Sequence, residues 1–143
     1  MSKLAQIERI VFLQTVDLFS YCRAQEVLRI ASITREEHFD RGDTIYEINQ
    51  PANELFCVVQ GTVALRDDNG EGAVVGPLHT FGVTEILSGR LRSATATATA
   101  ETLVLALDQE DFFDLLANNI DIVKALFRHL FQESASATKQ DRI

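Results

Sequence analysis

The sequence has no tryptophan and, among its 143 residues, only two cysteines, Cys22 and Cys57. Two cysteines are too few for a disulfide framework, and these two stand too far apart for a local metal motif, so we expect reduced thiols in a cytoplasmic protein. Long apolar runs are also missing: in the N-terminal segment the longest is Ile10 to Leu13, with charged residues close by. We therefore predict a soluble protein without a signal peptide or membrane insertion.

Positive charge is scarce, with 13 lysines and arginines against 21 acidic residues and a formal net charge of -8. A phosphate backbone would repel such a chain, and its arginines are scattered, so we expect no nucleic-acid partner. The histidines, His38, His79 and His129, fall in separate segments without the spacing of a metal-binding β-barrel enzyme. No serine lies in a nucleophile elbow. The sequence thus predicts no catalytic residue, no metal site and no enzymatic activity.

Apolar residues make up 46% of the sequence, which is enough to build the core of a single domain. They recur at helical spacing over residues 4–33, which predicts two short helices. Residues 35–107 change to short runs rich in Val, Ile, Thr, Leu and Phe, with turn signals spaced roughly 8 to 12 residues apart. This pattern is typical of an antiparallel barrel or jelly roll, so we predict a mainly β fold with flanking helices.

Helical spacing returns after Leu107. Asp108 is placed as the N-cap of a helix, with Asp111 completing a carboxylate variant of the capping box, and Asn118 with Asn119 predicts the end of that helix.

A broad apolar face follows over Ile122 to Phe131. It would cover the β-roll, form the seam of a homodimer or contact an effector partner, with core burial favoured. Residues 134–143 lack apolar periodicity and predict a flexible C-terminal tail, which leaves residues 1–133 as the domain.

Threonine and alanine alternate over residues 93–100, a pattern shared by a low-complexity linker and a strand. In an extended chain the threonines would share one face and the alanines the other. A linker should lead into more linker, but the Leu-rich segment 102–108 follows at once. We therefore predict an ordered strand over residues 93–99 and a hairpin turning near Ala100 and Glu101. The small alanine face suggests close packing against another element.

The candidate site lies just before this strand, in residues 81–94. Gly82 allows close backbone approach, a short helix would follow, and Gly89 suits the left-handed residue that ends it. The free N–H groups at such a helix start attract an anion, to which Arg92 would offer a forked guanidinium and Ser93 a hydroxyl. The alternative is a tight surface loop whose arginines are merely solvated.

The Phe-Gly pair, the short helix and the "RSATATA" segment together resemble the phosphate-binding cassette of the cyclic nucleotide-binding domain. Upstream, residues 39–65 resemble the first half of that family's β-roll, with Gly42 and Gly61 at its turn positions. The similarity covers roughly residues 5–133. It implies an eight-stranded antiparallel β-roll with N-terminal and C-terminal α-helices.

The resemblance also implies roles for single residues. Arg92 would pair with the cyclic phosphate of cyclic AMP or cyclic GMP, Ser93 and Ala94 would lie against that phosphate, and Gly82 would begin the cassette helix. No other cofactor is implied.

One position departs from the family, because Val83 stands where a glutamate usually accepts a hydrogen bond from the ribose 2′-hydroxyl. Valine cannot replace that acceptor, so we expect weakened binding of a ribonucleotide. Glu85 lies about 200 degrees further around a helix, so we expect it to point away from where Val83 points and not to substitute.

Two functions stay open. The domain is a regulatory module that binds a cyclic nucleotide or similar small anion and signals through a partner chain or domain, or it is a degenerate copy that serves as a structural or protein-interaction module. A cupin-like metalloenzyme would share the β-barrel, but the sequence lacks its ligands.

Overall fold

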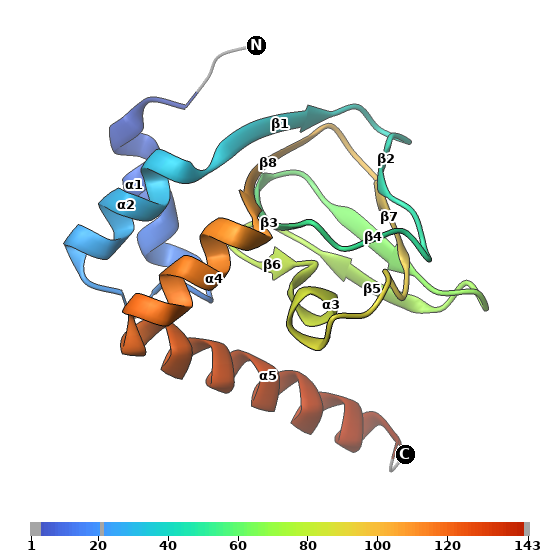
Figure 1. Cartoon of the computed structure of the whole chain (residues 1–143). Coiled ribbons are helices and arrows are strands. Elements are labelled where there is room, and N and C mark those ends of the chain that lie inside the picture. Colours follow the sequence, from blue (N-terminus) through green and yellow to red (C-terminus); the bar gives the residue numbers. More distant parts are fainter. Residues whose placement is uncertain (1–3, 21, 142–143) are drawn as a thin grey trace.

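A computed structural model describes residues 4–20 and 22–141 of the chain (Figure 1). Two helices come first, α1 (Gln6–Thr15) and α2 (Ala24–Ile33). The strands are β1 (Arg35–Phe39), β2 (Thr44–Tyr46), β3 (Glu54–Gln60), β4 (Val63–Arg66), β5 (Gly72–Val75), β6 (Thr80–Phe81), β7 (Thr95–Ala98) and β8 (Thr102–Asp108). Helix α3 (Val83–Ser88) lies between β6 and β7, and α4 (Gln109–Asn118) and α5 (Ile120–Asp141) follow β8.

The strands form two antiparallel four-stranded sheets, in the orders β1-β8-β3-β6 and β2-β7-β4-β5. Side chains from both sheets make one hydrophobic cluster, which includes Phe56 of β3, Val63 of β4 and Ala96 of β7. The predicted eight-stranded β-roll with flanking helices is confirmed.

A second cluster joins one sheet to the helices. Helices α1, α2 and α4 lie at one end of the roll, and α5 extends from that end past the roll (Figure 1). Leu55 and Cys57 of β3 belong to this cluster, whereas Phe56 and Val58 belong to the first. Because successive side chains of a strand point to opposite faces, β3 supplies both clusters at once. Strand β8 does the same, which explains why its residues from Thr102 to Leu107 are buried.

Within the Thr/Ala stretch, β7 is an ordered strand over Thr95–Ala98, so the prediction of a strand is confirmed but its bounds of 93–99 are too wide. The two alanines of β7 are fully buried, with Ala96 at 0% and Ala98 at 1% exposure. The predicted hairpin is wrong, however, because β7 pairs with β2 and β4 while β8 pairs with β1 and β3. The chain turns at residues 99–101 but crosses from one sheet to the other. Alternation determines which face of a strand is buried and does not determine its neighbours.

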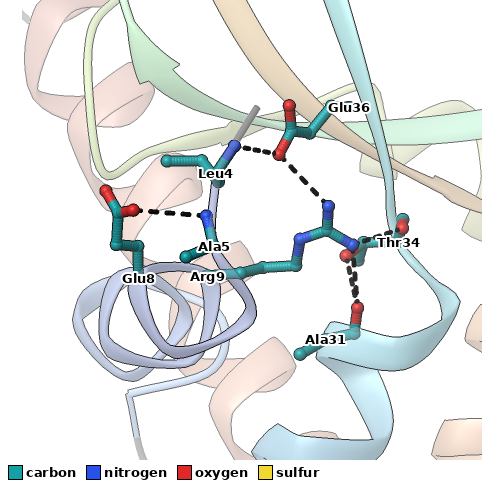
Figure 2. A network of polar contacts seen from close by, with 7 residues as sticks. All are labelled: Leu4, Ala5, Glu8, Arg9, Ala31, Thr34 and Glu36. Carbon is teal, nitrogen blue, oxygen red and sulfur yellow. Dashed lines mark hydrogen bonds and ion pairs between the residues drawn. The ribbon is translucent and has the colours of Figure 1, made fainter. Parts of the chain in front are cut away.

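Arg9 fastens α1 to the elements beside it (Figure 2). Its Nη1 donates to the carbonyls of Ala31 and Thr34 at 3.1 and 3.0 Å, and its Nη2 pairs with Glu36 of β1 at 3.2 Å. The backbone N–H of Leu4 donates to the same Glu36 oxygen at 2.6 Å. The guanidinium thereby satisfies carbonyls at the C-terminal end of α2, where a cation is favoured.

Helix α4 begins and ends at the residues that the sequence predicts, but the predicted capping hydrogen bond at its start is not formed. Asp108 is the N-cap residue, yet its side chain makes no capping hydrogen bond and instead accepts one from Arg35 at 2.9 Å. At the other end the side-chain amides of Asn118 and Asn119 donate to backbone carbonyls four residues earlier, and the helix ends at Asn118, where predicted.

The apolar face of α5 is divided. Ile122 and Leu126 pack into the core, whereas Phe127 and Phe131 are 56% and 69% exposed. The helix continues to Asp141, through residues for which the sequence predicts a flexible tail. The domain boundary at residue 133 stays a prediction. Within residues 4–20 and 22–141, none of the helices combines the length and apolar character needed to cross a membrane.

Candidate functional site

The predicted short helix is present as α3, and a glycine in the left-handed region stands at each of its ends. Gly82 has φ 85° and Gly89 has φ 69°, values that other residues rarely adopt. Gly82 has a second reason to lack a side chain, because a Cβ there would stand 3.0 Å from Arg92 Nη1. This glycine therefore sets both the entry into the helix and the approach of the arginine.

Arg92 is buried behind α3, with only 2% of its side chain exposed. Its Nη1 donates to the carbonyl of Gly82 at 2.8 Å, and its Nη2 donates to the carbonyl of Glu54. The guanidinium carbon lies 4.0 Å from the ring centroid of Tyr46, which is a cation–π contact. Backbone oxygens from two elements and one aromatic face therefore fix its position.

Glu85 completes the surroundings of this cation. Its Oε1 lies 3.1 Å from Arg92 Nη1, and its Oε2 accepts a hydrogen bond from Ser93 at 3.0 Å. The expectation that Glu85 points away from Val83 is wrong, because both residues line one cavity. That expectation treats side-chain directions as rigid, whereas a glutamate side chain is long and flexible enough to turn toward a buried cation.

The cavity beside the cassette has a volume of about 180 Å³. Its walls come from both sheets and from α3: Tyr46, Leu65, Ala73, Val75, Thr80, Phe81, Gly82, Val83, Thr84, Glu85, Ser93 and Ala94. Four of the five candidate site residues thus border the cavity. Arg92 is not part of this lining and reaches the site through its contacts with Gly82 and Glu85. The assignment of these residues to a ligand stays a prediction.

Tyr46 was not singled out from the sequence. Burial raises the pKa of its phenol to about 12, with Arg92 opposing this rise and Glu85 adding to it. The phenol is therefore neutral at pH 7, and its ring offers an uncharged face to Arg92. The ring also lies near Phe56 and Phe81, which stack on each other at 5.0 Å between centroids. No local motif marks Tyr46, since only the fold brings β2 next to Arg92.

Outside the cavity, His38, Asp40 and Glu101 form a group of metal-ligating side chains with ligand atoms within 4.8 Å of one another. Glu101 Oε1 lies 3.1 Å from Nε2 of the ring, whereas Asp40 lies 4.0 Å from Nδ1, so the carboxylates approach opposite nitrogens. Both carboxylates are largely exposed. This geometry is that of polar contacts at the surface. The side chain of His129 lies outside the described residues.

Comparison with known sequences identifies the family. The model of the cyclic nucleotide-binding domain matches residues 36–119, from β1 through the end of α4. The chain belongs to the cyclic nucleotide-binding domain family. A cyclic nucleotide-gated potassium channel from Mesorhizobium japonicum is 30% identical over 122 residues, which cover 85% of this chain and 34% of that protein. The chain spans between 14% and 34% of the length of its potassium-channel relatives.

Solved structures share the fold. The catabolite activator protein of Thermus thermophilus superposes with a TM-score of 0.77 at 26% identity, covering 87% of this chain and 61% of that one. A cAMP-bound mutant of the regulatory subunit of a cAMP-independent protein kinase A from Trypanosoma brucei superposes with a TM-score of 0.79 at 21% identity, covering 96% of this chain and 52% of that one. The cyclic nucleotide-binding domain is a regulatory module and not a catalytic one.

Proposed function

We propose that this domain binds a cyclic nucleotide in the cavity beside α3 and passes its occupancy to a partner chain or domain. The observation that carries the proposal is the buried guanidinium of Arg92, held next to the cavity by the carbonyls of Gly82 and Glu54. A buried cation is costly unless an anion accompanies it. In the structure Glu85 is that anion. A cyclic phosphate would take its place from the ligand side, with Ser93 donating its hydroxyl.

The apolar wall of the cavity sets a limit on affinity. Val83 is 4% exposed and lines the cavity, so a ribose 2′-hydroxyl would meet a side chain that cannot accept its hydrogen bond. A hydrogen bond to a charged group contributes on the order of 1.5 to 3 kcal/mol, or roughly tenfold to 150-fold in affinity. We therefore expect weak binding of cyclic AMP and cyclic GMP.

Signalling would leave the domain through α5. Phe127 and Phe131 stack with 6.3 Å between ring centroids, and both face outward on that helix. Exposed aromatic pairs of this kind are enriched at protein interfaces. The effector would contact this part of α5.

The second candidate function is that of a degenerate domain without a nucleotide, acting as a structural or interaction module. It is favoured by the size of the cavity, since about 180 Å³ falls below the roughly 300 Å³ at which small-ligand pockets begin. It is favoured also by Glu85, which already neutralises Arg92.

Calorimetric titration of the chain with cyclic AMP and cyclic GMP separates the two functions. We expect saturable binding by the wild type and its loss in Ala94→Leu, which places bulk in the cavity wall. Thr97→Val, on the face of β7 opposite to its buried alanines, is the control and should bind normally. Wild-type protein that shows neither heat nor a thermal shift at millimolar nucleotide would support the degenerate domain.

A further inference from the structure

One carboxylate already engages both side chains that would hold a phosphate. Glu85 Oε1 lies 3.1 Å from Arg92 Nη1, and Glu85 Oε2 lies 3.0 Å from the hydroxyl oxygen of Ser93. The side chains of Glu85 and Arg92 are only 13% and 2% exposed, so water screens this ion pair weakly. The two oxygens of Glu85 thus contact the donors that the proposed function gives to two phosphate oxygens.

A carboxylate and a cyclic phosphate present the same chemistry to a guanidinium and a hydroxyl, namely anionic oxygens that accept charge-assisted hydrogen bonds. Two anions cannot share these donors without strong repulsion in a shielded site. We propose that Glu85 is the specificity-determining residue of this pocket: its carboxylate occupies the phosphate subsite, and a cyclic nucleotide binds only by displacing it. The inference rests on the proposed function, because it places the phosphate at Arg92 and Ser93.

Displacement of Glu85 would leave the arginine in place. Arg92 keeps its bonds to the carbonyls of Gly82 and Glu54, neither of which involves the Glu85 side chain. The cation would therefore stay oriented toward the position that the carboxylate vacates. Glu85 also belongs to the wall of the cavity, so its withdrawal would enlarge a space of about 180 Å³.

Removal of the competing carboxylate should raise the affinity for a cyclic phosphate and leave phosphate-free ligands unaffected. The expected gain is about tenfold to 150-fold, the factor that corresponds to one charge-assisted hydrogen bond that the ligand no longer has to break. Adenosine carries the base and the sugar but no phosphate, so it does not compete with Glu85 for Arg92.

The experiment compares the wild type with Glu85→Ala and Glu85→Gln by calorimetric titration with cyclic AMP and with adenosine. Glu110→Ala is the matched control, since Glu110 is an exposed residue of α4 whose loss changes the net charge equally. We expect Glu85→Ala to bind cyclic AMP at least about tenfold more tightly, with a smaller gain for Glu85→Gln, which keeps an uncharged acceptor. Adenosine binding and the Glu110→Ala variant should show no gain.

The outcomes of this experiment either overturn or support the inference. Unchanged or weaker cyclic AMP binding by Glu85→Ala while the wild type binds would reject the role of Glu85 and leave the proposed function standing. An equal gain for adenosine would mean that space, and not charge, was released. Absence of cyclic AMP binding in every variant would reject both proposals. Cyclic AMP binding by Glu85→Ala alone would support the inference. If Glu85→Ala does not fold, Glu85→Gln carries the same comparison.

Discussion

Replacement of Arg92 by methionine tests whether this arginine holds the cassette together before any ligand arrives. Methionine keeps much of the side-chain length but removes every donor. The change leaves the carbonyls of Gly82 and Glu54 without their guanidinium partner, and it leaves Glu85 with only Ser93.

The magnitude follows from these contacts. Each orphaned buried acceptor costs about 1 to 3 kcal/mol, and breaking a buried ion pair by removing one partner costs about 3 to 5 kcal/mol. These costs do not add in full, because one side chain makes all of the contacts and its removal is a single change. We therefore expect Arg92→Met to reduce the free energy of unfolding by about 3 to 5 kcal/mol. This is a large part of the total free energy of unfolding of a typical domain, which is roughly 5 to 15 kcal/mol.

Urea unfolding followed by circular dichroism measures this loss. Arg90→Met is the matched control, because Arg90 is exposed and lies two residues earlier in the same loop, so its replacement should change stability by less than about 0.5 kcal/mol. A loss below about 1 kcal/mol in Arg92→Met would refute the reasoning, since removal of a guanidinium with these buried partners should lower the free energy of unfolding by more than that.

Three further predictions concern other parts of the domain. Val83→Glu should strengthen cyclic AMP binding by roughly tenfold or more while leaving 2′-deoxy cyclic AMP unchanged, and an equal effect on both ligands in calorimetry would contradict the ribose contact. Arg9→Met should lower the free energy of unfolding by about 1 to 3 kcal/mol, because it removes the guanidinium donor of the Ala31 and Thr34 carbonyls and breaks the ion pair with Glu36 (Figure 2). Urea unfolding checks this, and an unchanged midpoint would mean that α1 is held by apolar packing alone. Burial, and after it the charge of Glu54, raise the pKa of Glu37 in the folded protein. The stability that protonated Glu37 contributes is therefore lost as the pH rises and the carboxyl ionises. Glu37→Gln should therefore raise the melting temperature at pH 7 and have little effect below about pH 4, where the unfolded carboxyl is also protonated; a melting temperature lowered at pH 7 would show that the pairing with Arg35 outweighs burial.

The sequence by itself determined the features that depend on neighbouring residues. The glycines at 82 and 89 bound α3, because a left-handed residue favours glycine wherever the rest of the chain lies. The Thr/Ala alternation predicts the buried face of β7, because successive side chains of any strand alternate. The same local motifs carry the resemblance to the cyclic nucleotide-binding domain, which the comparison confirms.

The tertiary structure alone decided which distant groups meet. The turn after β7 leads into the other sheet instead of a hairpin, because pairing depends on where β2 and β4 already lie. Arg92 rests on Tyr46 and on a carbonyl 38 residues away in the sequence, which no spacing rule connects to it. Glu85 turns toward Arg92 because a buried cation lies within its reach, and helical angles alone place it elsewhere. Local patterns follow from the sterics of adjacent residues, whereas these contacts follow from burial and charge in the assembled fold.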